Sequence, residues 1–392
     1  MSVPLLLNLT HTSHTRARTG IQRVARALWQ HLGTEATPVT FDPYLRAWRA
    51  LEPWERAGLA RHDAGGKRGA QWPASARWRG RWRRFTRQTP VDTLDGDFPG
   101  FIEPELFSPA VARQLPVIFA QVRGPRVAVF HDAIALRFPE LSPAVTVARF
   151  PAYLRELLLF DGIAANSEDS RDSLVDYWRW LGAVNPPPVV AIPLGVDLPA
   201  APPAPFSPPA ATPVILCVGT IEGRKNQSAL LVACESLWQL GRQFELRMIG
   251  HAHTATGAAA LRHLRELQAA GRPLRYDGPV PEAALEAAYA ACAFTVYPSV
   301  AEGFGLPVIE SLARGKPCVC SARGAIGESA RGGGCLAFDT VDAPALAAAL
   351  TRLLDAPAEL AALAAAARAR SFKSWAGYTR ELLAWMRPLP RR

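Results

Sequence analysis

Residues 297–310 read YPSVAEGFGLPVIE, and this stretch gives the strongest indication of fold and function in the chain. A short apolar strand precedes it, and a helix is expected inside it because its second proline suits a first helical turn. Gly303 and Gly305 let backbone N–H groups approach a ligand closely, and the start of the helix adds positive potential. Two carboxylates, Glu302 and Glu310, flank the loop. Glu310 falls among apolar residues, so it needs a buried polar partner, and a ribose diol is a suitable one.

A second strand-to-helix loop, residues 218–226, reads VGTIEGRKN. Gly219 and Thr220 open this loop, and two adjacent cations, Arg224 and Lys225, close it. Such a pair can neutralise a pyrophosphate leaving group, the arginine by bidentate contact and the lysine as a point charge. Taken alone, a solvated basic turn is an equally good interpretation of this segment.

His131 follows the apolar residues 127–130. A histidine at the carboxyl end of a parallel strand lies where open α/β sheets bind ligands. A lone histidine is more often a satisfied core or surface residue, but the two loops described above favour a role in a site.

Strand and helix patterns alternate along both halves of the chain. Strands are expected at residues 3–9, 117–120, 127–130, 162–165, 189–192, 214–218, 245–249, 295–297 and 317–320. The Pro/Ala-rich stretch that ends at Pro213 is the best linker in the chain. Alternating βα units on both sides of it predict two doubly wound, Rossmann-like domains with parallel sheets. We expect an N-terminal domain over residues 1–195, a C-terminal domain over 196–372, and a last helix in 373–392 that packs back on the N-terminal domain.

Together these motifs resemble those of glycosyltransferase family 4, the group 1 glycosyltransferases. That family adopts the GT-B fold, has its donor site in the cleft between two Rossmann-like domains, and retains the anomeric configuration of the transferred sugar. The E-x7-E spacing of Glu302 and Glu310, the GFGLP core and the preceding YPS agree with the family motif. The resemblance implies that Glu310 holds the donor ribose and that Glu302 lies beside the transferred sugar. The loop residues that it implies for donor binding are Gly303, Phe304, Gly305 and Leu306.

The same resemblance implies that Arg224 and Lys225 bind the donor phosphates, beside Gly219, and that His131 lies near the donor sugar. Many members of the family carry an arginine directly after the first glycine of the phosphate loop. This chain has Thr220 there, and we infer that Arg224 supplies the missing charge. The family often has a Gly-Gly loop near the N-terminus that touches the donor. Here only Gly20 of that pair is present.

Two interpretations stay open. Arg16, Arg18 and Arg23 either face phosphate or form a solvated helix start. Asp132 either orients the neighbouring histidine or the acceptor, or it caps the next turn. Residues 192–197, IPLGVD, resemble the family's interdomain turn and mark the hinge.

The net charge of +10 is concentrated in one segment. Residues 46–87 contain 12 Lys/Arg, 3 Asp/Glu and five of the eleven tryptophans. Weak periodicity predicts an irregular insertion over about 46–99. Either residues 46–87 bind an anionic membrane surface, or the insertion is solvated and its tryptophans pack on the N-terminal domain. Nucleic-acid binding would rest on this segment alone, and because no nucleic-acid module is visible we expect no such partner.

The function expected from the resemblance is transfer of a sugar from a nucleotide diphosphate sugar to a saccharide or lipid-linked acceptor hydroxyl, in cell-envelope polysaccharide or glycolipid synthesis. No Asp-x-Asp motif stands out, so we expect no metal and no cofactor besides the donor. The six cysteines suit reduced core positions of a cytoplasmic protein, which is expected to be peripheral at the inner face of the membrane. No signal peptide or transmembrane run is expected. Alternatives are a nucleotide-sugar epimerase of GT-B fold and a non-catalytic sugar-nucleotide-binding or membrane scaffold.

Overall fold

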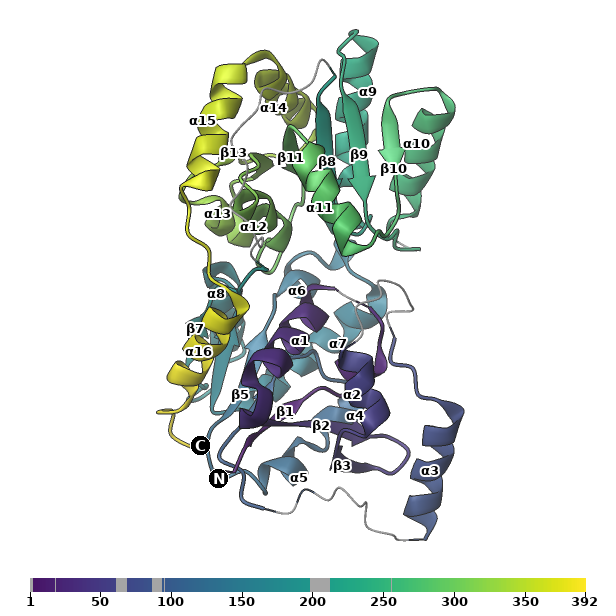
Figure 1. Cartoon of the computed structure of the whole chain (residues 1–392). Helices are drawn as coiled ribbons and strands as arrows, with labels where there is room; N and C mark the ends of the chain where they lie inside the picture. Colours follow the sequence, from purple (N-terminus) through teal and green to yellow (C-terminus); the bar gives the residue numbers. More distant parts are fainter. Residues whose placement is uncertain are drawn as a thin grey trace.

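The chain folds into two α/β domains that stack on each other (Figure 1). The computed structural model describes residues 3–17, 19–60, 69–86, 94, 96–197, 212–254 and 256–392. Each domain contains one sheet, and helices cover both faces of it (Figure 1). This arrangement confirms the prediction of two Rossmann-like domains.

The sheet of the N-terminal domain has seven strands in the order β3-β2-β1-β4-β5-β6-β7. All neighbours are parallel except β3, which is antiparallel to β2. The strands are β1 (Leu5–Asn8), β2 (Ala36–Asp42), β3 (Ala47–Ala50), β4 (Phe101–Glu103), β5 (Arg126–Phe130), β6 (Gly162–Ala165) and β7 (Val189–Ala191). The strand order reverses between β1 and β4, and ligands of such sheets bind at the carboxyl side of this switch point.

The sheet of the C-terminal domain has six parallel strands in the order β10-β9-β8-β11-β12-β13. They are β8 (Val214–Val218), β9 (Glu245–Ile249), β10 (Leu274–Tyr276), β11 (Phe294–Tyr297), β12 (Cys318–Ser321) and β13 (Cys335–Phe338). Here the switch point lies between β8 and β11. These are the two strands that end at the loops singled out in the sequence.

Helices follow most strands and bury one face against the sheets. In the N-terminal domain they are α1 (Gly20–Leu32), α2 (Pro53–Ala60), α3 (Ala74–Phe85), α4 (Pro109–Ala112), α5 (Leu115–Phe119), α6 (Ile134–Arg137), α7 (Ala144–Glu156) and α8 (Glu168–Trp180). In the C-terminal domain they are α9 (Gln227–Gln239), α10 (Ala258–Ala269), α11 (Glu282–Ala291), α12 (Leu306–Ala313), α13 (Gly324–Ala330), α14 (Ala343–Asp355) and α15 (Pro357–Arg368). Within β5, Val127 and Val129 pack on one face of the sheet and Ala128 and Phe130 on the other, so both faces are buried, as parallel sheets require.

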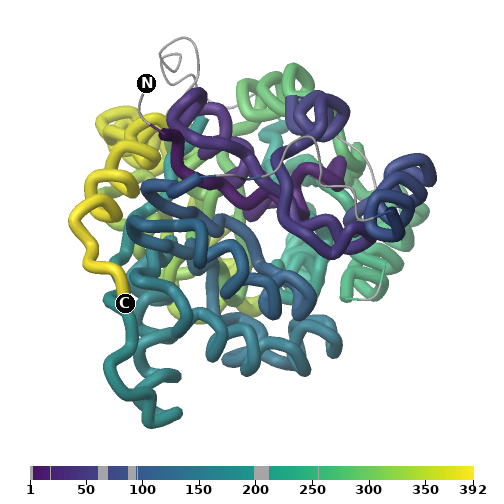
Figure 2. Tube along the Cα trace, turned by 90° about the horizontal axis from the view of Figure 1, so that it is seen from below, coloured from purple at the N-terminus to yellow at the C-terminus, as the bar shows by residue number. Residues whose placement is uncertain are grey.

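The last helix, α16 (Trp375–Met386), lies on the N-terminal domain. Its Trp375, Tyr378 and Leu382 share a buried cluster with Val24 and Leu28 of α1. Figure 1 shows the chain crossing from α15 to reach this position, and Figure 2 shows α16 along the outer side of the N-terminal domain. The chain therefore passes between the domains twice, once at the hinge and once before α16.

The strand expected at residues 117–120 is wrong, because residues 115–119 form helix α5. Short apolar runs do not distinguish a strand from a buried helix. The burial of Leu115, Ile118 and Phe119, at a spacing of three and four residues, is helical.

The irregular insertion expected over 46–99 is also wrong in its described part, since it forms β3, α2 and α3. Residues 61–68, 87–93 and 95 lie outside the described residues, as do 198–211 of the expected linker. Three of the five tryptophans pack on the N-terminal domain: Trp48 is in its core, the Trp54 indole donates to Glu52, and Trp72 stacks on His14. The other two, on α3, remain exposed.

Two sequence-based expectations about the whole chain can be compared with the structure. The six cysteines are free thiols, and all except Cys335 are buried. Among the described residues, no helix has the length and apolarity needed to cross a bilayer.

Candidate active site

The carboxyl ends of β5 and β11 meet across the interface between the domains. Gly303, in the loop after β11, lies so close to the main chain of His131 that a Cβ atom at this glycine would stand 2.2 Å from the His131 carbonyl oxygen. Only a residue without a side chain fits there. The Ser170 hydroxyl of α8 donates to the same carbonyl at 3.2 Å and to the Gly303 carbonyl at 3.4 Å. The loop of one domain is thereby held against the sheet of the other.

A cluster of three charges, of which Lys225 is buried and Arg224 and Glu302 are partly buried, forms the centre of the site. Lys225 Nζ lies 2.6 Å from Glu302 Oε1, and Arg224 Nη1 lies 2.6 Å from Glu302 Oε2. Arg224 also pairs with Glu222 at 2.8 Å. Because one carboxylate binds both cations, the loop after β8 (residues 219–226, the β8 loop) is tied to the loop after β11 (residues 298–305, the β11 loop). The backbone supports this contact, since Val300 N donates to the Arg224 carbonyl at 2.9 Å.

Burial and charge shift the pKa values of this cluster in different directions. Burial alone would raise the pKa of Glu302, but Arg224 and Lys225 lower it to about 2. Burial lowers the pKa of Lys225 despite its contact with Glu302. For Arg224, the attraction of Glu302 and Glu222 outweighs burial and raises the pKa. Glu302 is therefore a carboxylate at neutral pH, and the two cations are neutralised internally until an anionic ligand competes for them.

Tyr297, at the end of β11, is a further part of the cluster. The ammonium group of Lys225 donates to the Tyr297 hydroxyl and lies 4.6 Å from the centre of its ring. Burial raises the pKa of Tyr297 well above its usual range, so the phenol is neutral. This side chain fixes the position of Lys225, a role for which the sequence offered no signal beyond the place of Tyr297 at a strand end.

His131 is buried, and both nitrogens of its ring are engaged within the N-terminal domain. Nε2 donates to the Pro104 carbonyl at 2.8 Å, and Nδ1 accepts from Asn166 Nδ2 at 3.0 Å. The carbonyl can only accept, so the proton of the neutral ring is on Nε2. Burial lowers the pKa of His131, which keeps the ring neutral. The ring is thus locked in one orientation at the domain interface.

Asp132 is the residue for which the sequence left two interpretations. Its Oδ1 accepts from Ile134 N at 3.0 Å, so the side chain caps the turn that opens α6. Burial raises the pKa of Asp132, and the charge of Arg224 counteracts this. The Asp132 carboxyl therefore caps the turn, and its pKa depends on the charge of Arg224 in the β8 loop.

Glu310 is the fifth residue of α12 and is buried. Its Oε1 is 2.6 Å from Nη1 of Arg23 on α1, whose Nη2 also contacts Asp197 of the hinge at 3.0 Å. Arg23 therefore bridges the N-terminal domain, the hinge and the C-terminal domain. This resolves one open interpretation in part: Arg23 lies at the domain interface, Arg16 is exposed, and Arg18 lies outside the described residues.

The remaining predicted residues surround the same interface. Gly305, at the N-cap of α12, has φ 101°, a conformation that favours glycine. A Cβ at Gly20, the first residue of α1, would lie 4.0 Å from Leu306 across the interface. Phe304 and Leu306 pack against the apolar cluster of the N-terminal domain. Gly219 N donates to the Ile249 carbonyl at 2.8 Å, and the Thr220 carbonyl accepts from Gln227 Nε2 at 2.9 Å.

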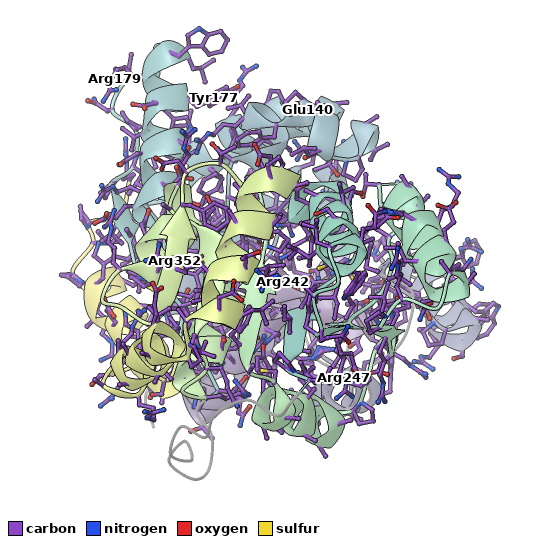
Figure 3. The ribbon with its side chains drawn as sticks, turned by 90° about the horizontal axis from the view of Figure 1, so that it is seen from above. Glu140, Tyr177, Arg179, Arg242, Arg247 and Arg352 are labelled. Carbon is purple, nitrogen blue, oxygen red and sulfur yellow. The ribbon has the colours of Figure 1, made fainter. Side chains whose placement is uncertain are left out.

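A groove on the described surface lies away from these residues. It has a volume of about 590 Å³ and runs along α6 and α8, where Tyr177 and Trp180 line it together with the three carboxylates Asp169, Asp172 and Asp176. Figure 3 shows Tyr177 and Arg179 on this outer helix. None of the predicted site residues lines the groove.

Comparison with known proteins agrees with this geometry. Residues 204–370 match the family described as glycosyl transferases group 1. These residues, which are less than half of the chain, therefore resemble the group 1 glycosyltransferases. The serotype-specific mannosyltransferase WbdA of Escherichia coli is 27% identical over 354 residues, which are 80% of this chain and 38% of WbdA. The O-antigen chain mannosyltransferase B of Escherichia coli is 34% identical over 170 residues, 43% of this chain and 44% of that protein. The chain thus spans less than half the length of these relatives.

The fold of the chain is that of solved GT-B structures. The structure of Anabaena HepE in complex with UDP and glucose superimposes with a TM-score of 0.69 and 14% identity, covering 99% of this chain and 100% of that chain. At this identity the likeness establishes the fold alone.

His131→Ala is expected to lower turnover more than donor affinity. The substitution leaves the Pro104 carbonyl and the Asn166 amide without their partner, which we expect to cost about 1–3 kcal/mol of the free energy of unfolding. Asn166→Ala is the matched control, because it removes one hydrogen bond and keeps the ring. Steady-state kinetics and thermal unfolding of both variants are the measurements. Full turnover by folded His131→Ala protein would assign this histidine a purely structural role.

Proposed function

We propose that this chain is a retaining glycosyltransferase that moves a glycosyl group from a nucleotide diphosphate sugar to an acceptor hydroxyl. The observation that carries the proposal is the cluster of Arg224, Lys225 and Glu302. Two adjacent cations in the β8 loop suit a diphosphate, and their partial burial strengthens the attraction to it because the local dielectric is low. The match of residues 204–370 to the group 1 glycosyltransferases supports the reaction class.

In the proposed complex, Glu310 accepts hydrogen bonds from the ribose hydroxyls, and Arg224 and Lys225 bind the diphosphate. Gly303, Phe304, Gly305 and Leu306 bring backbone N–H groups and the positive end of α12 to the phosphates and the sugar. Gly20 and Gly219, with Thr220, complete the walls of the site. Diphosphate binding must compete with the ion pairs of Glu302, which join two loops of the C-terminal domain. Ribose binding must compete with the ion pair between Glu310 and Arg23, which joins the two domains.

For the chemical step we propose front-face substitution. The bond between the anomeric carbon and the diphosphate oxygen breaks, and Arg224 and Lys225 stabilise the charge that develops on the leaving group. The leaving phosphate takes the proton of the acceptor hydroxyl, which attacks the same face. Because the His131 ring is neutral and held at both nitrogens, we assign it a positioning role and not that of a base. We propose that the charge of Glu302 stabilises an oxocarbenium-like sugar.

The donor and the acceptor are proposed from the relatives. Two of them are named as mannosyltransferases, one of them of O-antigen chains, and HepE was solved with UDP and glucose. We propose a hexosyl donor and an acceptor in envelope polysaccharide or glycolipid synthesis, reached at the cytoplasmic face of a membrane. We further propose that the protein cations take the place of a metal. Among the described residues, no three His, Cys, Asp or Glu side chains are grouped to hold one.

A panel of nucleotide sugars in a thermal-shift assay, followed by product analysis with the best hit, tests this function. A transferase raises its unfolding temperature with one donor class, releases nucleoside diphosphate slowly by hydrolysis alone, and releases it faster with a saccharide acceptor. An epimerase would return a changed sugar, and a scaffold would bind the nucleotide without turnover. The absence of binding to every nucleoside diphosphate would contradict the assignment of the site.

A further inference from the structure

Helix α3 exposes an aromatic stripe to solvent. Trp78, Trp82 and Phe85 are 63%, 50% and 83% exposed. Their spacing of four and three residues places them on one helix face. The rings also contact each other, since Trp78 and Trp82 stack at 5.5 Å and Trp82 and Phe85 lie 6.5 Å apart. Large exposed apolar side chains that form one patch mark an interaction surface more often than scattered ones do.

The opposite face of α3 attaches the helix to the domain. Ala76 and Gly80 are buried there, and a Cβ at Gly80 would stand 2.8 Å from Cβ of Tyr44. Arg79 and Arg83 pair with Glu52 at 2.8 Å and 3.3 Å. The small residues and the two ion pairs hold this face of α3 against the domain. The aromatic stripe on the opposite face therefore points to solvent. Figures 1 and 2 show α3 at the outer edge of the N-terminal domain, away from the C-terminal domain.

A row of arginines flanks the aromatic stripe. Arg77, Arg81 and Arg84 are exposed on α3, one helix side away from the stripe, and the helix contains no acidic residue. Arg81 lies over the Tyr44 ring at 5.5 Å. Within the described part of the chain, the ion pairs of α3 involve Arg79 and Arg83 only. The charge of this row is therefore presented to solvent.

We propose that α3 docks on the surface of an anionic lipid bilayer through Trp78, Trp82 and Phe85, with Arg77, Arg81 and Arg84 against the lipid headgroups. Tryptophan favours the level of the headgroups, and an amphipathic helix with a basic face lies in the plane of this interface. Charge complementarity selects the anionic partner. This inference rests on the proposed function in one respect: docking of α3 would bring the N-terminal domain to a lipid-linked acceptor.

The proposed membrane contact is shorter than residues 46–87, the segment for which the sequence suggested membrane binding. Of the basic, Trp-rich residues 46–87, Arg49, Arg79 and Arg83 are engaged in ion pairs with acidic residues of the domain. Trp48, Trp54 and Trp72 pack on it too. Among the described residues of this segment, the helix α3, of twelve residues, carries the exposed tryptophans.

Co-sedimentation with vesicles tests the proposal. The wild type is expected to sediment with phosphatidylglycerol/phosphatidylcholine vesicles at low salt, less at high salt, and not with phosphatidylcholine alone. The aromatic variant Trp78→Ser/Trp82→Ser/Phe85→Ser and the arginine variant Arg77→Ser/Arg81→Ser/Arg84→Ser should each bind at least about tenfold more weakly. Quenching of tryptophan fluorescence by brominated lipid in the wild type, lost in the aromatic variant, would show that the rings insert.

Matched controls come from other surfaces of the chain. Trp180→Ser/Val184→Ser/Leu240→Ser removes three apolar side chains that are equally exposed, and Arg179→Ser/Arg275→Ser/Arg352→Ser removes three exposed arginines. Figure 3 shows Arg179 and Arg352 on helices of different domains. Both control variants should bind vesicles as the wild type does. Nucleoside diphosphate binding, measured for every variant, verifies that the fold and the cleft are intact.

Three results would overturn the proposal: no vesicle binding by the wild type, equal binding by the wild type and the aromatic variant, or equal loss in the control variants. Binding of a single-stranded oligonucleotide that depends on α3, without vesicle binding, would assign the surface to nucleic acid instead. Transfer to a water-soluble saccharide acceptor does not need α3. A failure of membrane binding is therefore distinguishable from a failure of the proposed function.

Discussion

Lys225→Ala and Arg224→Ala are each expected to reduce turnover by roughly 10²–10³-fold, the range found when one group that stabilises developing charge is removed. Both cations contact Glu302 in the free protein and, in our proposal, the leaving diphosphate during the reaction. The loss should appear mainly in kcat, because the charge on the leaving group grows as the bond to the sugar breaks.

Two remote cations serve as controls. Lys316→Ala and Arg352→Ala remove a lysine and an arginine of the C-terminal domain that do not contact the β8 or β11 loop. They should leave kcat unchanged. If Arg224→Ala retains full turnover while Lys225→Ala does not, then Arg224 does not supply the charge that many family members have at the position of Thr220. Full activity in both variants would remove the ion cluster from the mechanism.

Glu310→Ala is expected to weaken nucleoside diphosphate binding by about 1.5–3 kcal/mol, because a charge-assisted hydrogen bond to the ribose is lost. This corresponds to roughly ten- to 150-fold in the dissociation constant measured by calorimetry. The variant also releases Arg23 from its ion pair, so the contribution of that pair has to be measured separately.

The other contacts of Arg23 provide that separation. Asp197→Ala removes an ion pair of Arg23 and keeps Glu310, and Arg23→Ala frees the Glu310 carboxylate for the ribose. Both variants should bind nucleoside diphosphate at least as well as the wild type. Unchanged affinity in Glu310→Ala would contradict the ribose assignment, and equal weakening in Asp197→Ala would attribute the effect to the domain contact.

The donor loops could be predicted from the sequence because each is a local unit. A strand, a glycine loop and a helix start follow one another within 14 residues at Tyr297–Glu310, and the cations of the β8 loop are adjacent in the chain. The need of buried Glu310 for a polar partner could also be read from its apolar neighbours. Its partner in the free protein, Arg23, could not be predicted from the sequence. The two residues are far apart in the chain and meet only through the contact between the domains.

Helix α3 shows why the sequence did not indicate a helix in the basic segment. An amphipathic helix normally marks its buried face by large apolar residues. In α3 the buried face carries Ala76 and Gly80, and the large apolar residues face solvent. The large apolar residues therefore do follow a helical period, but they mark the exposed face of α3 and not the buried one. The roles of Tyr297 and Asn166, which hold Lys225 and His131, likewise depend on contacts between distant segments.

The most direct test of the central claim is the stereochemistry of the transfer itself. An anomerically pure nucleotide diphosphate hexose, chosen by the thermal-shift panel, is incubated with the wild type and a saccharide acceptor, and the product is followed by proton NMR. Our account predicts one new glycosidic bond with the anomeric configuration of the donor and an equimolar release of nucleoside diphosphate, both lost in Lys225→Ala. A product of inverted configuration would contradict front-face substitution. An epimerised donor, or donor left intact with every acceptor, would contradict glycosyl transfer at this site.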